Sequence, residues 1–391
     1  MKTKHNKNYI KFAILAISSV LMTSMIASAI LADISMSYPS ADPSLIQMIM
    51  TLPSLMGMIF AISAGPLSGK IAKKIIVLVG LFSAFTGGML SYLFGSLSIY
   101  VLLLSSALIG VGQGINSTMS MALIADYFVG DESSSLMGLQ SAFVNGGSMV
   151  IIFISSLLAR LGWKSSYLIF LIFIPIIVIV MKYLPNDPPI QQQESSGEKG
   201  KLNGTVYFTA VVTFVFATLM FSFATNVAMF VVNNGLGDAT TAGLANTLMS
   251  AAGTVAGVIY GSIKKRLKDT IIPTAILLAG VGLLLINIVG SIASVFIAGA
   301  LIGFGLSLLM PTAMFIASSA VTPAMSANAI SLINGASNIG MFVSPFILNP
   351  IVNNFGGGES FKFLLCGTAL IILSIVAFVG RSKFNTSVDA K

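Results

Sequence analysis

Ala107-Leu108-Ile109-Gly110-Val111-Gly112 recurs 193 residues later as Ala300-Leu301-Ile302-Gly303-Phe304-Gly305. The same offset aligns four further places: Met121 with Met314, Leu139 with Leu332, Asn145-Gly146-Gly147 with Asn338-Ile339-Gly340, and Asp33 with Asn226. Apolar segments resemble one another by composition, so one match alone would carry little weight. A constant offset through separate regions predicts that the chain is an internal duplication.

Composition places this chain in lipid rather than in water. Of its 391 residues, 56% are hydrophobic and 8% are charged, whereas a soluble domain carries about 25% charged residues. The lipid bilayer must therefore surround most of the chain. A single histidine, His5, and a single cysteine, Cys366, leave almost no material for a metal site or a Cys/His nucleophile. We expect neither an enzyme nor a cofactor.

Apolar runs predict the fold. A helix that crosses the hydrocarbon core needs about 20 mainly apolar residues, and the chain contains twelve such runs. They cover approximately residues 12–33, 45–68, 75–94, 99–122, 137–159, 166–184, 205–232, 241–262, 271–289, 293–319, 328–352 and 361–380. The second run opens with Ser44 and Gln47, a spacing typical of a capping box. The sequence thus predicts an all-α membrane protein with two pseudo-symmetric six-helix halves, residues 1–184 and 205–391, joined by a cytoplasmic linker, 185–204.

The positive charges predict the orientation. With both termini in the cytoplasm, 17 of the 20 Lys and Arg residues fall on the cytoplasmic side, and Arg160, Lys164 and Lys362 fall outside. This asymmetry follows the positive-inside rule. The formal net charge of +8 is spread over membrane-flanking loops, so we expect no nucleic-acid partner. We expect an integral protein of the cell (plasma) membrane that functions as a monomer.

Two local motifs resemble those of the major facilitator superfamily. That family has the pattern Gly-x-Leu-x-Asp-Arg-x-Gly-Arg/Lys-Arg/Lys after its second helix. Here the stretch is Gly65-Pro66-Leu67-Ser68-Gly69-Lys70-Ile71-Ala72-Lys73-Lys74, with Gly69 at the usual Asp and Ala72 at the usual Gly. Gly162-Trp163-Lys164 resembles the family's Gly-Trp-Arg turn. With the helix count, linker and repeat, the resemblance spans the chain and implies two halves that rock about a central site.

Two departures from family patterns leave the subgroup open. Proton-coupled members often carry an Arg in the fourth helix, four residues before a Gly, and Ser106 stands at that position. Drug–proton antiporters typically have Gly-Pro-x-x-Gly-Gly in the fifth helix. The corresponding stretch here is Val150-Ile151-Ile152-Phe153-Ile154-Ser155. The resemblance therefore supports the superfamily more than the antiporter subgroup.

Two acidic residues have candidate roles. Asp33 lies about twenty residues into the first run. It is either a solvated residue of a helix end or a proton-titrating or cation-pairing residue at the rim of a cavity. Asp126 ends the fourth run, where the helix dipole disfavours an anion, so we expect it to pair with a nearby lysine of the loop after the second run. The predicted gating residues are Gly65, Lys70, Lys73, Lys74 and Asp126.

Neutral amides are the main polar side chains within the runs. Gln113 and Asn116 are spaced i, i+3, and Asn334 and Asn338 are spaced i, i+4, so each pair is expected to share a helix face. An amide in hydrocarbon needs a partner. These amides either form interhelical hydrogen bonds, or several of them line a central cavity and bind the solute. The candidate solute-binding residues are Gln113, Asn116, Asn145, Asn226, Asn334 and Asn338.

These features favour a secondary active transporter that moves a small, neutral or weakly charged organic solute by alternating access. Strongly anionic solutes need Arg or Lys clamps, which the runs do not offer. A drug or metabolite efflux pump of the same fold is the nearest alternative, and a non-transporting membrane sensor or a channel is the next. Coupling to a proton or another ion stays open.

Overall fold

The computed structural model describes residues 6–128, 131–188, 202–321, 326–355 and 357–381. These residues are helical apart from short connections, and the chain divides into two compact units, Met1–Gln193 and Glu194–Lys391. The division falls in the predicted linker, of which residues 189–201 lie outside the described part of the chain. We call these bodies unit 1 and unit 2.

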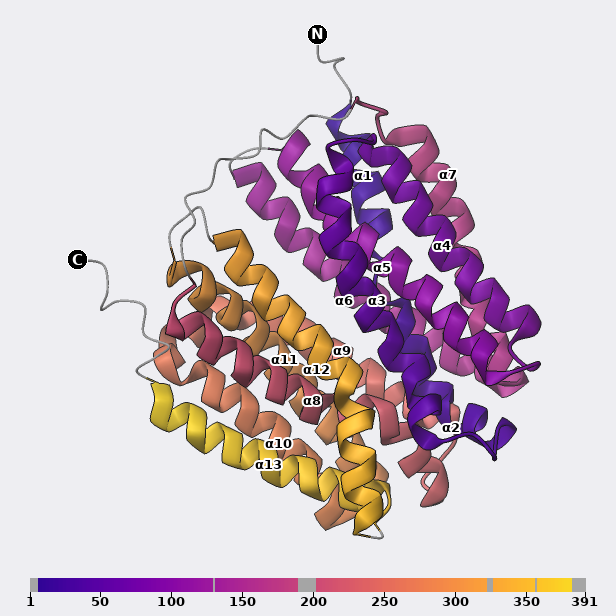
Figure 1. Ribbon diagram of the computed structural model, residues 1–391, viewed down its shortest axis with the longest axis vertical. Helices are drawn as coiled ribbons and strands as arrows, with labels where there is room; N and C mark the ends of the chain where they lie inside the picture. Colours follow the sequence, from indigo (N-terminus) through magenta and orange to yellow (C-terminus); the bar gives the residue numbers. More distant parts are fainter. Residues whose placement is uncertain (1–5, 129–130, 189–201, 322–325, 356, 382–391) are drawn as a thin grey trace. The chain divides into compact units, whose positions relative to one another are not determined.

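Unit 1 contains six apolar crossings (Figure 1). They are α1 (Lys7–Ser18) with η1 (Thr23–Ile26) and α2 (Ala27–Ser37), α3 (Pro43–Ser68), α4 (Lys73–Phe94), α5 (Ile99–Tyr127), α6 (Asp131–Leu158) with η2 (Ala159–Leu161), and η3 (Trp163–Ile172) with α7 (Phe173–Tyr183). The first and sixth crossings are not continuous α-helices. In the sixth, the helix changes from the 3₁₀ to the α form at Phe173, which places Pro175 in a first turn where its missing N–H has no cost.

Unit 2 repeats this organisation. It contains α8 (Gly204–Asn233), α9 (Ala239–Leu267), η4 (Lys268–Thr270), α10 (Ile271–Val289), α11 (Ile292–Ser319), α12 (Ser326–Asn354) and α13 (Glu359–Val379). Of eleven apolar helical stretches in the described chain, one, Ala239–Val289, has 51 residues. At 1.5 Å per residue it would measure about 75 Å, more than twice the hydrocarbon core. It turns at Lys268, where φ is 46°, and so provides two of the twelve described crossings.

The start of α3 shows how polar side chains set helix ends. Its first residue is Pro43, which suits a first helical position because it has no N–H to satisfy. Asp42 caps the helix, and its carboxylate accepts a hydrogen bond from the Ser44 N–H at 2.7 Å. The helix therefore begins two residues earlier than the predicted capping box would place it. Similar caps at α5, α8, α9 and α11 come from Ser98, Asn203, Asp238 and Ser291.

The repeated glycine motif brings helices of unit 1 together. Gly110 of α5 packs against Pro53 of α3, and Gly112 packs against Gly80 of α4. A Cβ atom added to either glycine of α5 would come closer than 3.0 Å to backbone atoms of the facing helix. Only glycine permits this approach, so α5 contacts α3 and α4 along two faces.

The same motif has the same use in unit 2. Gly303 of α11 packs against Met249 of α9, and Gly305 packs against Ala275 of α10, again closer than 3.0 Å for an added Cβ. In each unit the first glycine thus contacts the second crossing and the second glycine contacts the third. The 193-residue sequence repeat therefore corresponds to a repeated packing pattern.

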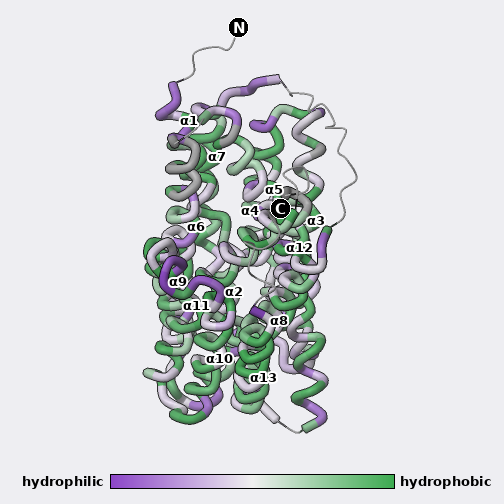
Figure 2. Tube along the Cα trace, turned by 90° about the vertical axis from the view of Figure 1, so that its left-hand side faces the viewer, coloured by the Kyte–Doolittle hydropathy of each residue, from purple (hydrophilic) through white to green (hydrophobic). Residues whose placement is uncertain are grey.

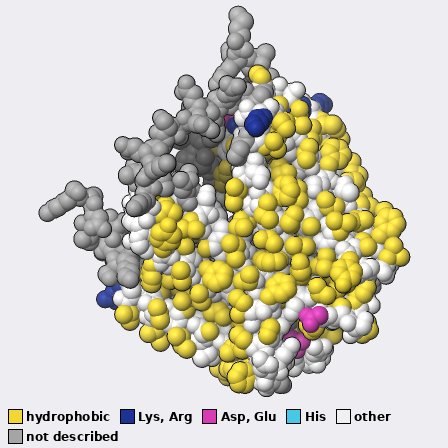
Figure 3. Space-filling model, viewed as in Figure 1, with side chains coloured by type: hydrophobic (Ala, Val, Ile, Leu, Met, Phe, Trp, Pro, Cys, Tyr) yellow, Lys and Arg dark blue, Asp and Glu magenta, His cyan; other side chains and the backbone are white. Residues whose placement is uncertain are grey.

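The surface of the described chain is apolar. Figure 2 shows hydrophobic residues along most of each helix, and hydrophilic residues near helix ends such as the start of α1 and the end of α9. The face in Figure 3 is covered largely by hydrophobic side chains, with few charged groups. Exposed apolar residues such as Phe82, Tyr100 and Val258 would not be tolerated in water on this scale. The chain is an integral membrane protein.

Candidate functional site

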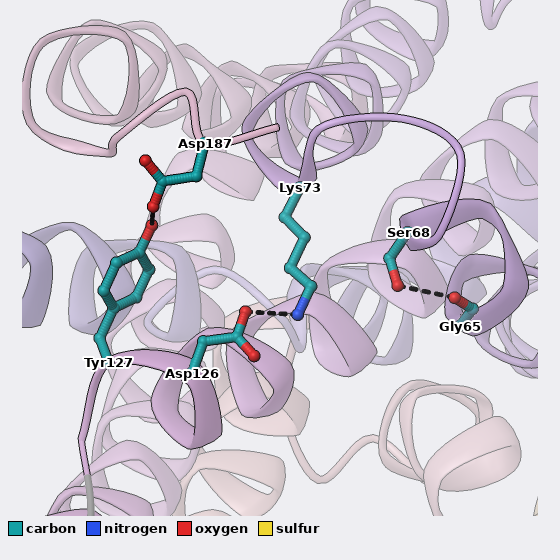
Figure 4. Close-up of polar contacts among 6 residues, drawn as sticks. All are labelled: Gly65, Ser68, Lys73, Asp126, Tyr127 and Asp187. Atoms are coloured by element: carbon teal, nitrogen blue, oxygen red, sulfur yellow. Dashed lines mark hydrogen bonds and ion pairs between the residues drawn. The ribbon is translucent and has the colours of Figure 1, made fainter. Parts of the chain in front are cut away.

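An ion pair joins α4 and α5 at one end of unit 1 (Figure 4). Lys73 is the first residue of α4, and its ammonium pairs with the carboxylate of Asp126 near the end of α5. Lys73 belongs to the motif loop from which a partner for Asp126 was expected. The two side chains are 18% and 31% exposed, and such partly solvated pairs contribute less than about 1 kcal/mol. The pair is better suited to holding two helix ends in register than to stabilising the fold.

The next residue along α5 makes a second contact in this region (Figure 4). The Tyr127 hydroxyl donates a hydrogen bond to Asp187 at 2.6 Å. Burial, and then the hydrogen bond and charge of Asp187, raise the pKa of Tyr127 well above its usual value, so it remains a neutral donor. Asp187 follows α7 and precedes the undescribed residues 189–201. Sequence reasoning missed this contact because it treated residues 185–204 as an unattached linker.

The other predicted gating residues are not part of one cluster. Lys74 donates to the carbonyl oxygen of Met181 at 2.7 Å. The Gly65 carbonyl accepts a hydrogen bond from Ser68 at 2.7 Å, within α3 (Figure 4). Lys70 is exposed and forms no ion pair with a residue in the described ranges. Only Lys73 of this loop contacts Asp126.

The Gly-Trp-Lys turn connects the sixth crossing to the first. Gly162 has φ of 106°, a region that L side chains rarely adopt, so the turn requires glycine. Trp163 then donates a hydrogen bond from Nε1 to the Ser37 hydroxyl at 3.0 Å. The turn therefore fixes η3 against the end of α2.

The two amides of α5 do not form one site. The Gln113 side-chain oxygen accepts a hydrogen bond from the Ser24 hydroxyl at 2.8 Å. Asn116 is 2% exposed and faces Gly80 of α4, and its Oδ1 has no hydrogen-bond partner among the described residues. Residues three apart differ by about 60° around a helix, and here that difference is enough to direct the two amides to different neighbours. The expectation that they share a face is corrected.

Asn145, the remaining candidate of unit 1, lies on α6. Its amide nitrogen donates to the Ser141 carbonyl oxygen at 3.1 Å, one turn earlier in the same helix. Gln140 is 4% exposed and donates to Ser120 of α5 at 3.4 Å. Gln140 therefore forms an interhelical hydrogen bond of the kind that amides commonly make in membranes. Asn145 is only partly buried, and its hydrogen bond stays within its own helix.

A buried lysine organises the polar residues of unit 2. Lys362, in the first turn of α13, is 7% exposed and donates hydrogen bonds to Asn226 of α8 at 2.8 Å and to Asn349 of α12 at 2.6 Å. We call these three residues the Lys362 node. Sequence reasoning counted Lys362 as a membrane-flanking charge outside the bilayer and did not select Asn349. The signal available in the sequence was that Lys362 directly precedes an uninterrupted apolar run.

Asn334 and Asn338 differ from the other amides. They lie one turn apart on α12, and both are half-buried. Neither side chain makes a hydrogen bond with a residue that the structure describes. Their amide groups are therefore available to an outside molecule, unlike Asn226, whose oxygen is bound to Lys362.

Asp33 lies near the end of the first crossing, four residues before α2 stops at Ser37. It is half-buried, and its backbone carbonyl accepts a hydrogen bond from the Ser37 hydroxyl at 2.9 Å. This position agrees with both interpretations of Asp33, the solvated helix end and the rim of a cavity. Among the described residues, no group of three His, Cys, Asp or Glu side chains gathers as metal ligands would.

Comparison with known proteins identifies the family. The sequence model of the Major Facilitator Superfamily matches residues 12–231 and 209–390. The chain belongs to the Major Facilitator Superfamily. This confirms the resemblance drawn from the residue 65–74 loop and the Gly162 turn, and it confirms the twelve-helix fold class. No curated protein matches the sequence of this superfamily member.

Solved structures of the superfamily agree. A POT family transporter in complex with a thioalcohol-conjugated peptide has a TM-score of 0.78 at 13% identity and covers 96% of each chain. The POT family transporter PepTSo has a TM-score of 0.74 at 14% identity, covering 96% of this chain and 98% of that one. A POT family transporter in complex with 5-aminolevulinic acid has a TM-score of 0.77 at 13% identity and covers 98% of each. At these identities the likeness shows a shared fold.

Proposed function

We propose that this chain is a secondary active transporter that moves a small, neutral or weakly charged organic solute across the membrane by alternating access. Membership of a superfamily of transporters supports the activity. The polar groups left accessible in the described crossings support the solute class, because they are mainly uncharged.

The observation that carries this proposal is the state of the amides. Asn334 and Asn338 of α12 and the amide nitrogen of Gln113 have no hydrogen-bond partner among the described residues, and all three side chains are only partly buried. Lys362, the buried cation of the described crossings, is occupied by two amide oxygens. A solute would thus meet amide donors and acceptors rather than the Arg or Lys clamp that a strongly anionic solute needs.

Several finer features belong to the same proposal. The transporter acts as a monomer in the plasma membrane, with both termini in the cytoplasm, and the Lys73–Asp126 pair opens and closes during transport. Asp33 at the end of α2 is the proposed coupling acid, should a proton accompany the solute. The efflux reading differs only in the direction of net transport.

A ligand screen followed by a flux measurement tests the activity. Purified protein in detergent is screened by thermal shift against neutral metabolites and drug-like molecules. Short peptides and 5-aminolevulinic acid are included because two structural neighbours were solved in complex with a conjugated peptide and with 5-aminolevulinic acid. A specific ligand raises the unfolding temperature by mass action. Counterflow in proteoliposomes with that ligand then distinguishes a transporter from a non-transporting sensor. A transporter exchanges labelled for unlabelled solute, whereas binding without exchange would indicate a sensor.

Two variants of α12 and one matched control test the site. We expect Asn334→Leu or Asn338→Leu to weaken binding of the identified solute by about tenfold, since one lost hydrogen bond is worth about 1.4 kcal/mol. Asn116→Leu is the control, because Asn116 is enclosed between α4 and α5. Equal effects of all three variants on affinity would contradict the assignment.

The coupling acid is tested separately. Asp33→Asn keeps the size of the side chain and removes its charge, so any dependence of exchange on an imposed pH gradient should disappear. Exchange is measured at several external pH values for wild type and variant. A variant that keeps the full pH dependence would remove Asp33 from the mechanism.

A further inference from the structure

The turn between α9 and α10 concentrates positive charge. It contains four cations and one acidic residue, Lys264, Lys265, Arg266, Lys268 and Asp269. Figure 2 shows this end of α9 as hydrophilic. A turn that joins two crossings lies outside the hydrocarbon, because lipid cannot satisfy its backbone. These charges therefore lie at the membrane surface, and we call residues 264–268 the basic turn.

Unit 1 has the corresponding turn between α3 and α4, and there two cations have partners in the protein. Lys73 pairs with Asp126 at the end of α5, and Lys74 donates to the Met181 carbonyl oxygen. α5 and α11 begin 193 residues apart, so the repeat places Ser319 of α11 where α5 has Asp126. Unit 2 thus lacks the carboxylate that neutralises the turn of unit 1.

The cations of the basic turn have no carboxylate partner. Lys265, Arg266 and Lys268 are exposed, and none of them forms an ion pair with a residue that the structure describes. Lys264 instead contacts an aromatic ring of α11, with its Nζ 3.3 Å from the centroid of Phe315. A cation–π contact can hold α9 against α11, but it does not cancel the charge.

The other acidic residues in the described part of unit 2 are too far away to neutralise the turn. Asp238 caps the opposite end of α9, which at 29 residues is about 43 Å long. Glu359 lies beside the far end of α10, because Asn287 donates to the carbonyl oxygen of Ser360 at 2.7 Å. Asn287 is about 24 Å along α10 from Ile271. Screening removes most of an interaction beyond about 8 Å, so four cations and one carboxylate leave the turn a local charge of +3.

The exposed face of α9 that leads to the basic turn changes from apolar to cationic. Val258, Ser262, Lys265 and Arg266 are spaced i, i+4, i+7 and i+8, so they share one side of the helix. Val258 is 80% exposed, and the other three are exposed as well. An apolar side chain, a hydroxyl group and two cations follow one another in the order of the acyl chain, glycerol and phosphate of a phospholipid. A soluble anion would match the cations alone.

We infer that the basic turn binds the headgroup of an anionic phospholipid, with Lys265, Arg266 and Lys268 facing its negative charge and Val258 contacting an acyl chain. This interaction goes beyond the proposed transport activity and does not depend on the solute. Each Lys or Arg near an anionic membrane surface strengthens binding about fivefold, so three of them contribute up to about 100-fold. A zwitterionic headgroup has no net charge to gain from them.

Quenching of a dye beside the turn by labelled lipid tests the inference. Ser262→Cys supplies the attachment site, since Cys366, the one natural cysteine, is fully buried. The full-length protein is placed in nanodiscs that contain phosphatidylcholine and an increasing fraction of phosphatidylglycerol, and either lipid in turn carries a nitroxide on its acyl chain. We expect the dye to report a preference for phosphatidylglycerol of at least about fivefold. The preference should fall when NaCl is raised from about 50 to about 500 mM, which shortens the screening length.

Variants of the basic turn supply the controls. Lys265→Gln/Arg266→Gln/Lys268→Gln should reduce the preference to less than about twofold, with little change in the unfolding temperature because the three side chains are exposed. Lys268→Gln alone should lower it about fivefold, and Arg266→Lys, which keeps the charge, should retain it. The same dye at Ser63→Cys of α3 reports on the turn of unit 1, and there the preference should be smaller.

Several results would overturn the inference. They are a wild-type preference below about twofold at position 262, an equal preference at position 63, and a preference that survives in the triple variant or at high salt. Displacement of phosphatidylglycerol by millimolar inorganic phosphate would assign the cations to a soluble anion instead. A triple variant that loses stability in pure phosphatidylcholine would assign them to an acidic segment of protein. None of these results depends on flux, whereas absence of counterflow with every screened solute would refute the proposed transport activity alone.

Discussion

Replacing Lys362 with methionine tests whether the ammonium group of the Lys362 node stabilises unit 2, or whether packing of the apolar stem is sufficient. The substitution keeps most of the apolar stem and removes the ammonium, which donates to Asn226 and Asn349. A lost hydrogen bond between a charged ammonium and an amide oxygen costs about 1.5–3 kcal/mol, while removal of the ammonium also relieves its desolvation. We expect a net loss of about 2–4 kcal/mol.

The relative stabilities of the variants distinguish the cost of a poorly paired buried charge from the cost of lost hydrogen bonds. Asn226→Leu should cost more, about 3–5 kcal/mol, because it leaves a buried charge with one acceptor. The triple variant Lys362→Met/Asn226→Leu/Asn349→Leu has no unpaired group left at the node. It should therefore be more stable than Asn226→Leu alone, since an apolar replacement of a buried polar cluster is often neutral or stabilising.

The protein contains its own reporter for this experiment. Cys366 is the only cysteine of the sequence, lies one turn after Lys362 and is fully buried. A maleimide dye that fluoresces on reaction with Cys366 reports when this part of unit 2 unfolds. For a unit of this size about 2–4 °C corresponds to 1 kcal/mol, so Lys362→Met should lower the midpoint of thermal unfolding by about 4–16 °C.

Lys164→Met in unit 1 is the matched control, because Lys164 is a partly exposed lysine whose contact with Ser96 is 3.4 Å long. It should change the midpoint by less than about 2 °C. An unchanged midpoint in Lys362→Met, or a triple variant less stable than every single variant, would refute the reasoning.

Three further predictions concern unit 1. Lys73→Met should change the midpoint little, because its pair with Asp126 is partly solvated, yet alter the exchange rate in counterflow; a wild-type rate would contradict a gating role. Gly112→Val should destabilise the protein by at least about 3 kcal/mol, because the new side chain collides with the α4 backbone. Thermal unfolding measures this loss, and Gly65→Ala is the control because nothing lies within 4 Å of an added Cβ there. Burial and Asp187 raise the pKa of Tyr127, so its stabilising contribution should be complete below about pH 10 and fall at higher pH; pH-dependent melting of wild type and Tyr127→Phe should diverge only there.

The sequence indicated which residue types could form a candidate site, but not their hydrogen-bond partners. Amides were expected either to form interhelical hydrogen bonds or to line a cavity. Asn226 pairs with Lys362, while Asn334 and Asn338 are half-buried, and their role in solute binding stays a prediction. The sequence could not separate them, because the partner of Asn226 lies 136 residues away on another helix. The interruption after Ser18 was missed for a similar reason. Serines and threonines are compatible with a helix, and only the packing around them decides whether the backbone bends.

The sequence by itself determined that lipid surrounds most of the chain, how many helices cross it, and that the two halves are a duplication. Apolar run length, charge asymmetry and glycine spacing are local properties, and lipid leaves a chain few ways to satisfy its backbone other than as helices. Only the tertiary structure decided which polar groups are paired. Lys362 is buried because α8 and α12 bring two amide oxygens to it. Hydrogen-bond partners are set by proximity in space, which linear spacing does not encode.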